Sequence, residues 1–151
     1  MQRFVFSLDR VLAWRRLEAR RERLRWEQIR GELRGIDAER ERLRTERDLA
    51  AALLHTARSA LGAEFAALDQ FRAHVDAEMA RLGTKRADCE KRLAEQARVA
   101  AAKERDVKIL EHLRERRLEI WTAALDRETE QQAAEAFLAR WRREGISSRE
   151  N

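Results

Sequence analysis

Hydrophobic residues recur along most of this chain at alternating intervals of three and four positions. Stepping in this way from Ala19 to Leu61 gives thirteen positions, most of them apolar. The same stepping from Leu68 to Leu110 gives another thirteen, again mostly apolar, and charged residues fill the positions between. Sustained 3-4 spacing is typical of helices that pair along a narrow seam, as in a coiled coil.

Two such seams in succession predict an all-α fold, a long antiparallel two-helix coiled-coil hairpin with an overhanging C-terminal helix. Ser7 is a good N-cap for the first helix, Gly62 favours a turn, and Gly145 ends the last helix. We expect a single coiled-coil domain over residues 1–151. Its expected parts are a first helix at about 8–60, a turn at about 61–67, a second helix at about 68–143 and a frayed tail at 144–151.

The pairing register follows from the two seams, because facing residues in an antiparallel pair have numbers with a nearly constant sum. A sum of 129 places Ile36 against Leu93 and Ala50 against Met79, and a register shifted by one heptad fits nearly as well. Arg40 occupies a seam position, where its stem can lie along apolar surface while its head reaches water. Such positions weaken the pair and help to specify its register.

This register leaves the end of the second helix without a partner. The first helix begins near Ser7, so its pairing surface ends near Trp121, and the pattern stays helical beyond that point. An unpaired helix with an apolar stripe needs something to bury it. We therefore expect a docking surface for another protein, with dimerisation or folding back on the hairpin as the alternative. Its apolar residues share one helical face: Ala134, Phe137, Leu138 and Trp141.

Composition agrees with long helices. The chain has 151 residues, of which 40% are charged, with no proline and only five glycines. So many charged residues leave few residues for a compact globular core, and the lack of Pro and Gly argues against an all-β fold. A hydrophobic content of 44% and four Trp argue against disorder. The net charge of +5 favours an acidic or polyanionic partner without identifying it.

No pattern of residues indicates chemistry. There is no glycine-rich phosphate-binding loop, and the three histidines lie far apart. His74, Asp76 and Glu78 are close in sequence, but their spacing places Asp76 on another side of the helix. The single cysteine, Cys89, lies on the seam and is expected to be a small packing residue. We expect no enzyme, no catalytic residue, no cofactor and no metal.

Nucleic-acid binding and membrane insertion are also not expected. A basic DNA-binding helix is nearly free of acids, whereas Glu18 and Glu22 interrupt the Arg10–Arg25 segment. The longest uncharged run in the helical body, Leu49–Ala57, is too short to span a bilayer. The N-terminal residues contain no apolar signal segment, so we expect a cytoplasmic protein.

Three segments resemble the flagellar export protein FliJ family. The opening Phe4-Val5-Phe6-Ser7-Leu8-Asp9-Arg10-Val11-Leu12, with Arg15 and Glu18, is similar to the family's start, F-x-F-x-L-x-x-V-L-x-x-R. The run from Glu104 to Glu115 resembles the family's E-x-x-x-K-x-L-E-x-L-x-E segment. Glu130-Gln131-Gln132 and Glu135 are similar to the family's ending, and the resemblance covers essentially the whole chain.

The resemblance implies a non-enzymatic stalk or chaperone-like component of the flagellar type III export apparatus, similar to the γ-subunit coiled coil of rotary ATPases. Implied partners are the hexameric export ATPase, the export-gate membrane protein and export chaperones, and the protein would reach the inner membrane face only through them. Candidate contacts with the ATPase ring are Arg15, Arg16, Arg20, Phe137, Leu138 and Trp141. Candidate contacts with the export gate are Phe71, Val75 and Met79.

Two other functions remain open. One is the equivalent stalk of a virulence type III secretion system, which the sequence barely separates from the flagellar stalk. The other is a self-assembling coiled-coil scaffold. A nucleic-acid binder ranks below both.

Overall fold

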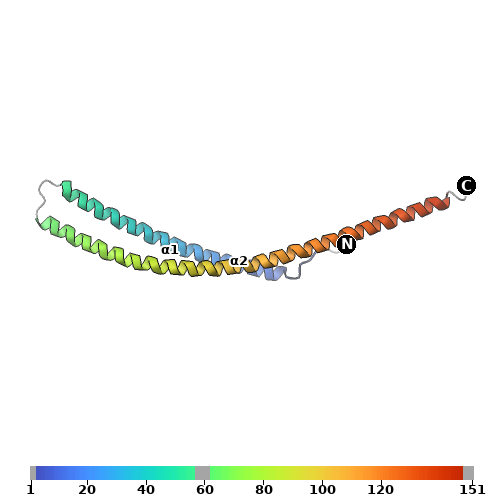
Figure 1. Cartoon of the computed structure of the whole chain (residues 1–151), viewed down its shortest axis with the longest axis horizontal. Helices are drawn as coiled ribbons and strands as arrows, with labels where there is room; N and C mark the ends of the chain where they lie inside the picture. Colours follow the sequence, from blue (N-terminus) through green and yellow to red (C-terminus); the bar gives the residue numbers. More distant parts are fainter. Residues whose placement is uncertain (1–2, 57–61, 148–151) are drawn as a thin grey trace. The chain divides into compact units, whose positions relative to one another are not determined.

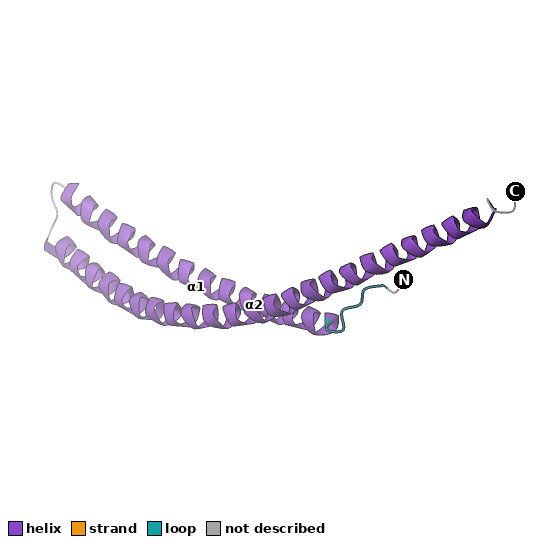
Figure 2. Ribbon diagram, turned by 45° about the vertical axis from the view of Figure 1, so that its right-hand side comes forward, coloured by secondary structure: helices purple, strands orange, loops and turns teal. Residues whose placement is uncertain are grey.

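The fold is two long helices that pack against each other in antiparallel fashion, as predicted. The computed structural model describes residues 3–56 and 62–147. Helix α1 is Asp9–Thr56 and helix α2 is Gly62–Ser147 (Figure 1). Among the described residues only the segment 3–8, which precedes α1, is not helical (Figure 2). The all-α fold class is therefore confirmed.

Contacts divide the chain into two compact units. The central unit is Leu17–Glu104, which holds most of α1 and the first half of α2. The terminal unit combines residues 1–16 with residues 105–151. In each unit a piece of the N-terminal half of the chain lies against α2.

The predicted seam forms the core of the central unit. The buried side chains on α2 include four that recur every seven residues, which is one heptad position repeated along the helix. Cys89 is one of them, 3% exposed, with its Sγ 3.5 Å from the carbonyl oxygen of Ile29, so its packing role is confirmed. The remaining described seam side chains are half-buried. The buried apolar residues of this unit are Ala19, Leu68, Val75, Leu82, Cys89 and Ala100.

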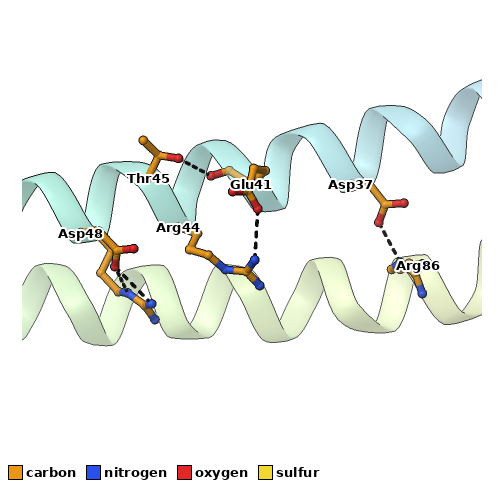
Figure 3. Close-up of polar contacts among 7 residues, drawn as sticks. Asp37, Glu41, Arg44, Thr45, Asp48 and Arg86 are labelled. Carbon is orange, nitrogen blue, oxygen red and sulfur yellow. Dashed lines mark hydrogen bonds and ion pairs between the residues drawn. The ribbon is translucent and has the colours of Figure 1, made fainter.

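The predicted register is wrong by one heptad. Arg86 Nε donates to Asp37 Oδ1 across the helices at 2.7 Å, and the two residue numbers add up to 123 (Figure 3). Other inter-helix pairs run from a sum of 118, for Glu22 with Gln96, to 127, for Arg23 with Glu104. These sums centre on about 122, seven below the predicted 129. The seam positions align in both registers, so the apolar pattern did not discriminate between them.

Several predicted boundaries also need correction. Helix α2 begins at Gly62, so residues 62–67, predicted as a turn, are helical. Glu64 in the first turn of α2 interacts favourably with the helix dipole, and glycine within a helix costs only about 1 kcal/mol. Residues 144–147, predicted as a frayed tail, continue α2, and residues 57–61 and 148–151 lie outside the described part of the chain.

The start of α1 differs from the predicted cap. Helix α1 begins at Asp9, whose N–H donates to the carbonyl oxygen of Phe6 at 3.1 Å in a turn that precedes the helix. The Ser7 hydroxyl accepts a hydrogen bond from Arg117 Nη1 at 3.0 Å instead of capping α1. Ser7 therefore ties the N-terminal segment to α2, and its prediction as the N-cap was wrong.

The non-helical segment 3–8 extends the pairing of the terminal unit beyond the end of α1. The Phe4 and Trp121 rings lie 5.9 Å apart at a tilted angle. Phe6 and Leu12 are each 2% exposed, which makes them the buried residues of this unit. Two aromatic side chains of segment 3–8 thus cover a stretch of α2 that the first helix does not reach.

Candidate protein interface

The last part of α2 is a helix without a covering partner in the described structure. Every residue from 126 to 142 is exposed, and we call this stretch the overhang. Its three large apolar side chains, Phe137, Leu138 and Trp141, are 68%, 50% and 66% exposed. They lie within about 100° of one another around the helix axis, so they form one face. The predicted unpaired stripe is therefore present as an exposed surface.

A groove that sequence analysis missed lies where segment 3–8 meets α2. This open groove has a volume of about 560 Å³ in the terminal unit, and Ile120 and Val5 on its walls are 70% and 78% exposed. Arginine side chains at two positions on the wall give it positive charge beside apolar surface. This groove forms where the non-helical segment 3–8 packs on α2, so the helical periodicity of the sequence could not predict it. Its lining residues are Arg3, Phe4, Val5, Arg117, Ile120, Trp121 and Ala124.

The three arginines predicted to contact an ATPase ring differ in what they contact here. Arg16 Nε and Nη2 donate to Glu111 Oε1 at 3.0 and 2.6 Å, so this guanidinium already binds α2. Arg15 lies 3.8 Å from Asp106 Oδ2, a looser ion pair. Arg20 is exposed and has no ion pair among residues 3–56 and 62–147. Of the three, Arg20 offers its charge most freely to another molecule.

The residues predicted to contact an export gate belong to the packing between the helices. Val75 is completely buried, and Phe71 and Met79 are half-buried. Val75 and Met79 were themselves seam positions, so their burial follows from the pattern that predicted the core. A contact through Val75 would require α1 to move away. Near the start of α2 the exposed aromatic side chain is Phe65, at 51%.

Polar side chains enter the seam and hydrogen-bond across it. Gln96 Nε2 donates to the backbone oxygen of Glu22 at 3.0 Å and to its carboxylate at 2.7 Å. The hydrogen bond from Gln96, followed by the nearby charge of Arg25, lowers the pKa of Glu22, while burial opposes this shift. Lys103 Nζ lies 3.5 Å from Glu18 Oε1 one turn along. These pairs hold the helices together, and the carboxylates of Glu22 and Glu18 both have partners across the seam.

The acidic residues near His74 are also engaged. Asp76 lies 3.6 Å from Arg47 Nη1, and Glu78 Oε2 accepts hydrogen bonds from Arg81, one of them at 2.7 Å. Over residues 3–56 and 62–147, no three metal-binding side chains converge. In the same ranges, neither helix contains a stretch apolar enough to cross a bilayer. The exposed features described above are the overhang, the groove and Arg20.

Comparisons with protein-family models, with curated proteins and with solved structures each found no match.

Proposed function

We propose that this chain is a non-enzymatic helical component of the flagellar type III export apparatus, a stalk that binds other proteins. The observation that carries the proposal is the overhang, which exposes Phe137, Leu138 and Trp141 beyond the last residue covered by the N-terminal segment. Aromatic side chains on an otherwise polar helix are typical anchors of protein interfaces. The resemblance of the chain's opening to the FliJ family supplies the identity of the apparatus.

In this proposal the overhang and Arg20 contact the ring of the export ATPase. The start of α2, with Phe65 exposed, takes the place of Phe71, Val75 and Met79 as the contact with the export gate, because Val75 is buried. The protein works in the cytoplasm and reaches the membrane only through its partners. Export chaperones are a third class of partner, to which we assign no surface.

Replacing both aromatic anchors tests the proposal. Phe137→Ala with Trp141→Ala removes exposed side chains, so thermal unfolding and helicity should stay unchanged. Binding to the purified export ATPase should weaken more than tenfold, since an anchor truncated to Ala costs ~2 kcal/mol or more. The matched control is Glu128→Ala with Gln132→Ala, which removes an exposed contact of 3.3 Å on the opposite face of the overhang.

Three results would count against the proposal. Unchanged ATPase binding by the aromatic double variant would place the contact elsewhere. Equal loss in the control variant would indicate a non-specific effect. Retained ATPase binding together with loss of a homo-oligomer, measured by sedimentation velocity, would favour the second candidate function, a self-assembling scaffold. The same exposed face supports that candidate, because a second copy could cover it.

A further inference from the structure

The seam of the central unit permits more than one register. In the observed register, in which facing numbers add up to about 122, Ile29 lies opposite Leu93 and Leu43 opposite Met79. If α2 shifts by one heptad, Ile36 lies opposite Leu93 and Ala50 lies opposite Met79. Apolar residues face apolar residues in both arrangements.

Charged seam residues do not discriminate between these registers either. Arg40 faces Leu82 in the observed register and would face Cys89 after a one-heptad shift. Arg47 likewise faces Val75 in the observed register and would face Leu82 after the shift. In each case a long arginine stem lies against an apolar side chain, which is how such residues are accommodated in a seam. The arginine stems, like the apolar seam positions, therefore leave the register open, whereas the hydrogen bond of Gln96 with Glu22 belongs to the observed register.

Two of the flanking ion pairs do discriminate. Asp37 binds Arg86 at 2.7 Å and Asp76 lies 3.6 Å from Arg47, both between the two helices. Figure 3 shows the first of these pairs beside Glu41–Arg44, which lies within α1 and would move as one piece with that helix. A one-heptad shift would place Asp37 near Leu93 and Arg47 near Gly83, so both pairs would be lost. By contrast, Glu32–Arg92 and Glu104–Arg23 would be replaced in the shifted register by Glu39–Arg92 and Glu104–Arg30.

We propose that these two inter-helix ion pairs select the register of the central unit, and that a second register one heptad away becomes populated when they are removed. A shift of seven residues moves α2 along α1 by ~10 Å. The start of α2 offers little packing against such a shift, because residues 62–67 are all exposed. The hairpin thus has two registers, which differ in where the first turns of α2 lie along α1. This inference concerns the chain alone and does not depend on the proposed function.

Disulfide trapping tests this inference. In a Cys89→Ala background, Leu93→Cys is combined with Ile29→Cys to report the observed register, or with Ile36→Cys to report the shifted one. A disulfide requires Cα atoms within ~7 Å, and the two registers differ by ~10 Å along the axis, so each pair reports one state. Both reporter pairs are then made with native charges and with the charge variants.

The test variant neutralises the carboxylates of these two pairs: Asp37→Asn and Asp76→Asn. The matched control is Glu41→Gln and Glu78→Gln, which removes the same charge from two pairs within single helices. With native charges and in the control, we expect the 29–93 disulfide to dominate. In the test variant, the yield of the 36–93 disulfide should rise at least tenfold, and 1 M NaCl should raise it in the native chain, because salt screens exposed pairs.

Three outcomes would overturn the inference. If the 36–93 yield stays at its native level in the test variant while helicity is retained, something other than these pairs holds the register. If both disulfides fail and circular dichroism shows loss of helix, the pairs maintain the fold itself and no second register exists. A rise of the same size in the control variant would also refute it, since the effect would then follow net charge alone.

Discussion

Arg40 is a seam residue whose replacement should stabilise the protein. Its Nε atom is buried and lacks a hydrogen-bond partner within the described structure. A buried donor without a partner costs about 1–3 kcal/mol, because the water it lost on folding is not replaced. The side chain as a whole is only half-buried, so the outer part of the guanidinium keeps contact with water. The penalty therefore applies to one nitrogen and falls in the lower part of that range.

Leucine at position 40 should remove this penalty and keep apolar volume opposite Leu82. We expect Arg40→Leu to raise the free energy of unfolding by about 1–2 kcal/mol. For a chain of this length that corresponds to an increase in Tm of roughly 2–8 °C. The measurement is thermal and urea unfolding followed by circular dichroism, at one protein concentration so that self-association does not enter the comparison.

Arg42→Leu is the matched control, since Arg42 is exposed and pairs within α1 with Glu39 and Glu46. Loss of an exposed pair should lower the free energy of unfolding by no more than about 1 kcal/mol. The two substitutions remove the same charge but should have effects of opposite sign. A lower stability for Arg40→Leu would refute the reasoning, and would mean that the guanidinium contributes more through its outer nitrogens than its buried Nε costs.

Two further predictions concern titration and the N-terminal arginines. The lowered pKa of Glu22 means that its bond with Gln96 contributes stability above pH 4.5, which is lost as pH falls through the lower folded-state pKa. Gln96→Leu should therefore reduce the loss of unfolding free energy between neutral and acidic pH, measured by urea titration; an unchanged pH profile would contradict this. Arg16→Glu should lower Tm by a few degrees because it faces Glu111 with a like charge, whereas Arg20→Glu should leave Tm within about 1 °C. Equal Tm values for the two variants would show that the Arg16 pair contributes nothing.

The sequence contained enough information for the helices and the core but not for their register. Heptad spacing identified the seam because burial of apolar side chains is the largest favourable energy in a two-helix pair. A periodic pattern, however, matches itself after every shift of one period. The register therefore depends on non-periodic features such as the pair Asp37–Arg86. Each contact of this kind is weak, and it can be identified only once the positions of both helices are known.

Sequence analysis missed the groove and the burial of Val75 for different reasons. Contacts of Phe4 and Phe6 with α2 join residues more than a hundred positions apart, and a non-helical segment has no periodicity that would predict where it lies. Val75 was expected to contact the export gate, although its seam position already assigned it to the core. Within a regular helix, a residue's position around the axis decides its exposure more than its distance from the end.

The distribution of charge pairs indicates which parts of α2 are committed to the fold and which are free for binding. Along the central unit, acidic and basic side chains flanking the seam pair between helices, as in Asp37–Arg86, so neutralising them should change the chain's own structure. In the overhang, the pair Glu128–Gln132 lies within α2, and Phe137 and Trp141 are exposed. Substitutions there can remove binding without a structural cost. A loss of ATPase binding by the overhang variants could then be attributed to the interface itself, whereas the same loss from a central-unit variant would first have to be separated from a change of register.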